Sequence, residues 1–155
     1  MNAPVAGLLA DLPLPRQVAI AHLLRTALHT ARELGRLYAA FAGRTEIPPL
    51  RTALVDLWRA KATEVSALES LARATAAALR EEAGPVPDPA WAGESGNGRP
   101  EDFGRVFRGE QVLAAVYREV LTLARDPACL PGLADLATAQ GLHRVRVRDL
   151  YRQYS

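Results

Sequence analysis

Four long stretches of this chain carry apolar residues in alternating steps of three and four, and this period constrains the fold more than any other feature. Such a period places the apolar side chains on one face of an α-helix. We expect helices at about residues 15–42, 49–82, 102–125 and 133–154, because segments containing proline and glycine separate them. Strand-like alternation of useful length is absent, and alanine and leucine far outnumber β-branched residues. The sequence therefore predicts an all-α protein.

The connections between these helices predict their arrangement. The breaks at 43–49 and 126–132 are short, so helices one and two, and helices three and four, should form antiparallel hairpins. The connection at 83–101 is rich in proline and glycine, and at ~3.3 Å per residue it can span more than ~50 Å, which is enough to cross a bundle. We expect a single domain over residues 1–155, in which 1–14 is a loose lead-in and 83–101 is the crossover between the two hairpins.

The charges and the cysteine usage exclude several classes of protein. Lys and Arg number 19 against 17 Asp and Glu, and the net charge of +2 provides no strong general attraction to nucleic acid. Lys61 is the only lysine and Cys129 the only cysteine, so no intramolecular disulfide can form, which fits a reducing compartment. The N-terminus lacks the basic region of a signal peptide, and no apolar run reaches the ~20 residues of a membrane helix. We expect a cytoplasmic protein with no membrane partner.

Five polar residues interrupt the apolar stripes near the middle of three helices. Lys61 and Glu64 lie on the second helix, Glu110 on the third, and Gln140 and His143 on the fourth. If the helices pack as two hairpins, these side chains meet at one level of the core. Burying a charge is costly unless the charge is paired or bound to a metal ion. The sequence therefore predicts a polar core cluster, and the cluster needs a physical reason.

Two motifs connect this cluster to a known family. The stretch GEQVLAAVY places Glu110 seven residues before Tyr117, and LYAAFAG places Tyr38 near the end of the first helix. These motifs resemble those of the ferritin-like di-iron proteins, especially the rubrerythrin-like branch. The resemblance covers about residues 20–152 and implies a ferritin-like four-helix bundle with Tyr38 and Tyr117 supporting the site. It also implies a homodimer that pairs through an apolar face.

The same resemblance implies six metal ligands, and only half of them are present here. The matching residues are Glu64, Glu110 and His143, and the departures are Ala31, Ala67 and Gln140. Carboxylates and imidazoles together suit iron or manganese. For the homodimer, Trp58 beside the second stripe and Trp91 in the crossover are candidate contact residues.

Two functions remain open at this point. In the first, Lys61 neutralises the remaining carboxylates where metal ions would stand, no cofactor binds, and the bundle has a non-catalytic binding or structural role. In the second, Glu64, Glu110 and His143 are remnant ligands for iron or manganese in a metal-binding oxidoreductase or an iron- or peroxide-handling stress protein. Either way, the sequence does not specify a small-molecule substrate.

A third function, binding to DNA, would rest on a row of arginines on the fourth helix, Arg144, Arg148 and Arg152. The near-neutral total charge and the lack of interleaved aromatic residues favour an ordinary charged surface instead.

Overall fold

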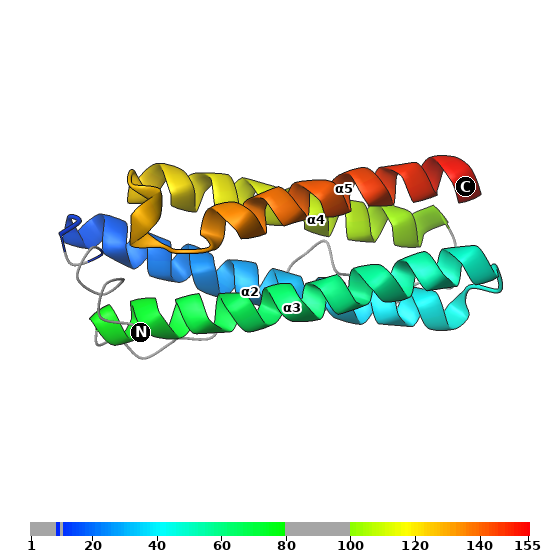
Figure 1. Ribbon diagram of the computed structural model, residues 1–155, viewed down its shortest axis with the longest axis horizontal. Helices are drawn as coiled ribbons and strands as arrows, with labels where there is room; N and C mark the ends of the chain where they lie inside the picture. The colour runs from blue at the N-terminus through cyan, green and yellow to red at the C-terminus, as the bar shows by residue number, and fades with distance from the viewer. Residues whose placement is uncertain (1–8, 10, 80–99) are drawn as a thin grey trace.

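The structure is a computed structural model that describes residues 9, 11–79 and 100–155. The described chain is dominated by four long helices, α2 (Leu14–Arg44), α3 (Pro48–Leu79), α4 (Pro100–Ala124) and α5 (Leu133–Tyr154), and a short 3-10 helix, η1 (Pro127–Cys129), precedes α5. The long helices lie alongside one another (Figure 1). No strand occurs among the described residues, so the prediction of an all-α helical bundle is confirmed.

The predicted helix boundaries lie within a few residues of the observed ones wherever the structure describes them. The expected lead-in at 1–14 is too long by one residue, because α2 begins at Leu14 with Pro15 in its first turn, where proline fits a helix. The expected crossover at 83–101 lies outside the described residues, except that Pro100 and Glu101 already belong to α4. Trp91 lies outside them too.

Both described connections between long helices are tight. The backbone N–H of Thr45 donates to the Phe41 carbonyl at 3.0 Å and closes α2, after which three residues lead to Pro48 at the start of α3. Between α4 and α5, Arg125 and Gly132 adopt positive φ angles of 60° and 85° on either side of η1. The left-handed backbone turns the chain sharply there, and glycine adopts it without steric cost. Each connection therefore keeps its two helices adjacent (Figure 1).

Helix α2 is the centre of the packing. It contacts both α3 and α4 extensively, α4 also contacts α5, and α3 and α5 contact each other over a shorter stretch. The three-and-four spacing predicts one buried row on α2, and every residue of that row is buried: Ile20, Leu24, Ala27, Ala31, Leu34, Tyr38 and Phe41. None of the helices in the described ranges combines the length and the apolarity that crossing a bilayer demands.

The three-and-four spacing predicts a buried row on α4, and this prediction is partly wrong. The row is Phe103, Phe107, Glu110, Ala114, Tyr117, Leu121 and Ala124. Three of its positions are only half-buried: Phe107, Ala114 and Leu121. The residues one position earlier are buried instead: Val106, Leu113 and Val120. A shift of one residue is a rotation of about 100°. Because α4 has neighbours on two sides, it carries two adjacent apolar rows, and the half-buried row borders α5.

Candidate functional site

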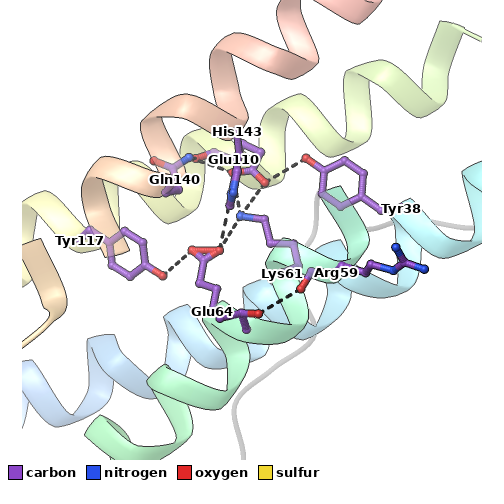
Figure 2. A network of polar contacts seen from close by, with 9 residues as sticks. Tyr38, Arg59, Lys61, Glu64, Glu110, Tyr117, Gln140 and His143 are labelled. Atoms are coloured by element: carbon purple, nitrogen blue, oxygen red, sulfur yellow. Dashed lines mark hydrogen bonds and ion pairs between the residues drawn. The ribbon is translucent and has the colours of Figure 1, made fainter. Parts of the chain in front are cut away.

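The polar residues that interrupt the apolar stripes meet in the interior of the bundle (Figure 2). We call the whole set the polar network: Tyr38 from α2, Lys61 and Glu64 from α3, Glu110 and Tyr117 from α4, and Gln140 and His143 from α5. All of these residues are buried except His143, which is half-buried. The periodicity of the sequence thus identified side chains that the structure brings together.

Lys61 lies at the centre of the polar network. Its Nζ is 2.7 Å from Glu64 Oε2 and 2.7 Å from Glu110 Oε1, and it also donates to Glu110 Oε2 at 3.0 Å. The spacing of three residues places Lys61 and Glu64 on the same face of α3. Because the lysine side chain is 0% exposed, its desolvation must be offset by these two carboxylates. One ammonium group therefore bridges two buried acids.

Each carboxylate also accepts a hydrogen bond from a tyrosine. Tyr38 Oη donates to Glu110 Oε1 at 2.9 Å, and Tyr117 Oη donates to Glu64 Oε1 at 2.7 Å. Burial raises the pKa of both hydroxyls well above the usual value, and the neighbouring negative charges raise it further. Both tyrosines therefore stay protonated and act as hydrogen-bond donors in the folded protein.

The hydrogen bonds of Gln140 explain why an amide stands where the family pattern has a glutamate. Its Nε2 donates to the Glu110 carbonyl oxygen at 2.6 Å and to Glu110 Oε2 at 3.0 Å. Both partners are acceptors, so the amide must present its nitrogen, which an ionised glutamate lacks. With this bond in place, each carboxylate oxygen of Glu64 and Glu110 has a donor within hydrogen-bonding distance.

His143 sits at the edge of the polar network. Its Nδ1 lies 4.0 Å from Glu64 Oε2 and has no hydrogen-bond partner. Burial lowers the pKa of the imidazole, the nearby Lys61 ammonium lowers it further, and the attraction of Glu110 and Glu64 only partly compensates. Near neutral pH the imidazole is therefore uncharged, and Lys61 is the cation of the network.

The acids closest to the missing ligand positions do not enter the interior. Glu33 pairs with Arg36 at 2.7 Å, and Glu69 pairs with Arg32 at 2.8 Å. Both pairs lie at the surface of the bundle, as the helical period predicts. Neither acid therefore replaces a carboxylate of the family pattern.

The residues of the polar network do not fit a pair of metal ions. Lys61 Nζ fills the space between Glu64 and Glu110 at hydrogen-bonding distance from both. Ala31 is buried and Ala67 half-buried, and neither side chain has an atom that could ligate a metal. Within residues 11–79 and 100–155, no group of three or more His, Cys, Asp or Glu side chains is placed to hold a metal ion.

A third buried carboxylate, outside the polar network, was not predicted from the sequence. Asp102, in the first turn of α4, is buried, with Arg44 Nη2 at 3.6 Å and Arg105 Nη1 at 3.9 Å from its oxygens. An acid in the first turn of a helix is favoured by the helix dipole. That position was the only sequence signal, and it did not reveal the pairing with α2.

Comparisons of this chain with protein-family models, with curated proteins and with solved structures found no match.

Proposed function

We propose that this chain is a ferritin-like bundle, built from two antiparallel hairpins and a long crossover, with a binding or structural role rather than a redox role. In this proposal an ammonium-bridged network takes the place of a metal pair. The observation that carries it is the position of Lys61 Nζ, 2.7 Å from the carboxylates of both Glu64 and Glu110. The expected homodimer remains part of the proposal, with Trp58, 44% exposed on α3, as a candidate contact.

The balance of charge supports this proposal. In the ferritin-like family, four carboxylates and two histidines surround two metal ions. A single ammonium can neutralise far less negative charge than two metal ions. The departures at Ala31 and Gln140 each remove one carboxylate from the family pattern and leave Glu64 and Glu110 beside Lys61. The loss of two carboxylates and the presence of Lys61 together keep the charge of the site balanced without metal ions.

The competing function is a metal-dependent oxidoreductase or an iron- or peroxide-handling stress protein. It requires an iron or manganese ion to displace Lys61 from Glu64 and Glu110. The observation in its favour is His143 Nδ1, which has no hydrogen-bond partner and lies 4.0 Å from a Glu64 oxygen. Such a displacement would push a buried ammonium group out of its ion pairs, at a cost of several kcal/mol.

Metal analysis separates the two functions. The protein is purified from cells supplied with iron or manganese, and its metal content is measured. A parallel sample receives ferrous iron anaerobically and then oxygen, and its near-ultraviolet spectrum is followed. We expect far less than one ion per chain and no spectral change. About two tightly held ions per chain would contradict the proposal. In a Lys61→Ala variant the ammonium is absent, so uptake of an ion by this variant alone would show that the lysine excludes it.

A further inference from the structure

The surface between α4 and α5, which lie side by side in Figure 1, contains two hollows. The first, of about 310 Å³, lies between Ala114 and Arg118 of α4 and Gly141 and Arg144 of α5. The second, of about 430 Å³, is lined by aromatic and basic residues: Phe103, Phe107, Arg148, Tyr151 and Arg152.

Both hollows open on the same face of the helix pair. On α5, residues 141, 144, 148 and 152 follow steps of three and four, which keep side chains on one side of a helix. The parts of α5 that line the two hollows are centred about nine residues apart, or ~14 Å at 1.5 Å per residue. We call this surface the α4–α5 groove. Its length suits an elongated partner better than a small molecule.

The charge of the α4–α5 groove has one sign. Four arginines line it and no acidic residue does: Arg118, Arg144, Arg148 and Arg152. Within the described part of the chain, Arg148 alone of these has an ion pair, with the exposed Asp149 at 3.6 Å. Such a surface attracts acidic partners.

The two hollows differ in chemistry. In the second, the rings of Phe103 and Tyr151 contact each other edge to face, with centroids 5.7 Å apart, and Tyr151 is 48% exposed. The first hollow is lined partly by Tyr117 and Gln140 of the polar network. Because the amide nitrogen of Gln140 donates inward, its oxygen is the atom left for a ligand. One hollow therefore suits an aromatic or aliphatic anchor, and the other suits an anchor with a hydrogen-bond donor.

We propose that the α4–α5 groove binds an acidic amphipathic helix of a partner protein. Apolar anchors on one face of a helix, two to three turns apart, match hollows ~14 Å apart. Acidic residues beside these anchors would meet the arginines. A second copy of this chain fits less well, because apposed identical grooves would bring the arginines of both copies together. This groove rests on the binding role proposed above, and it adds to that role a binding surface and a class of partner. Binding at the groove does not depend on the metal content of the core.

The test uses fluorescein-labelled synthetic peptides of 18 residues with an alanine background that favours helix, one Leu anchor and one Trp anchor 7, 8 or 11 positions apart, and glutamates beside the anchors. The Trp ring N–H supplies the hydrogen-bond donor. Anisotropy measures the binding of these peptides to the full chain. We expect saturable binding that the double variant Arg148→Glu/Arg152→Glu weakens at least about tenfold. Gly141→Leu should also weaken binding, since a Cβ at Gly141 meets nothing within 4 Å and the side chain can fill the first hollow. Arg146→Glu, an exposed arginine of α5 outside the groove, should change binding less than about twofold.

Several outcomes would overturn this inference. They are a failure of all three peptides to bind, equal binding of peptides with the same composition in shuffled order, and an Arg146→Glu effect as large as that of the double variant. Sedimentation and a gel shift with duplex DNA test the other occupants. A dimer that Gly141→Leu dissociates would assign the groove to a second copy. DNA binding that is lost in the double variant, without peptide binding, would assign it to nucleic acid.

Discussion

The polar network and the α4–α5 groove both contain several charged side chains, but the two regions differ in the burial and the pairing of these charges. In the network, Lys61, Glu64 and Glu110 are buried and paired with one another. In the groove, guanidinium groups such as those of Arg144 and Arg152 lie at the surface with no acid in the lining. Charges paired in this way fix how the helices pack and offer nothing to a partner. Unpaired charges add little to folding and remain available for binding.

Helix α5 supplies residues to both regions, and Gln140 lies on the boundary between them. Its amide nitrogen donates to Glu110 inside the bundle, and its side chain also lines the first hollow of the groove. The contrast between the two regions can therefore be tested by substitutions a few residues apart. The free energy of unfolding should depend strongly on the residues of the polar network and weakly on those of the α4–α5 groove.

Removing the ammonium should have the largest effect. We expect Lys61→Met to lower the free energy of unfolding by about 3–5 kcal/mol, because two buried carboxylates lose their counter-ion. Urea denaturation at neutral pH measures it. Arg59→Met, at an exposed position of the same helix, is the matched control and should lie within about 0.5 kcal/mol of the wild type. A Lys61→Met protein as stable as the control would show that the core charges are not coupled.

Removing either tyrosine hydroxyl should have the next largest effect. Tyr38→Phe and Tyr117→Phe each delete a hydrogen bond to a buried carboxylate, and we expect a loss of about 1.5–3 kcal/mol for each in the same urea measurement. Tyr151→Phe in the groove serves as the control, because its ring is half-exposed. Losses no larger than that of the control would mean that water satisfies the carboxylates.

The same tyrosines should limit stability in alkali. Their pKa values are raised in the folded protein, so above about pH 10 the folded state holds protons that the unfolded chain has released. Stability should therefore be intact below pH ~10 and fall as pH rises further. Absorbance at 295 nm, which detects tyrosinate, should show these two groups ionising together with the loss of helical circular dichroism. If the two tyrosines ionise while the protein remains helical, their hydroxyls are not held protonated by burial in the folded state, and the prediction is wrong.

A smaller effect is expected in mild acid. The pKa of His143 is lowered in the folded protein, so the unfolded chain takes up a proton first as pH falls. The contribution of His143 should be present above pH ~6.5 and decline below it. We expect His143→Asn to flatten the dependence of urea stability on pH between 5 and 8. His22→Asn, at an exposed position on α2, is the matched control for the loss of one imidazole.

The groove should contribute least to stability. We expect Arg148→Glu/Arg152→Glu to shift the free energy of unfolding by no more than about 0.5 kcal/mol per site, because these side chains are exposed and lack a buried partner. Thermal denaturation, monitored by circular dichroism, measures this shift in stability. A loss comparable to that of Lys61→Met would show that the arginines hold the bundle together, and the contrast between the two regions would disappear.

The sequence predicted the helices and the meeting of the polar residues well, because both follow from the period of burial along each helix. It could not determine the rotation of α4, where Val106 and Phe107 offer two adjacent apolar rows. Only the positions of α2 and α5 decide between them. The hollows of the groove depend on that rotation, so they too were missed. The kinship with ferritin-like proteins remains a prediction, since the motifs around Glu110 and Tyr38 support it and no comparison tests it.

The chain's only lysine is also its central buried cation. An amine-specific acylating reagent therefore finds, besides the α-amino group, a single target that is shielded in the folded bundle. The speed at which mass spectrometry detects acylated Lys61 would record how often the interior opens to solvent. Acylation of Lys61 would thus report the rate at which the core of the wild-type protein opens, without an engineered label.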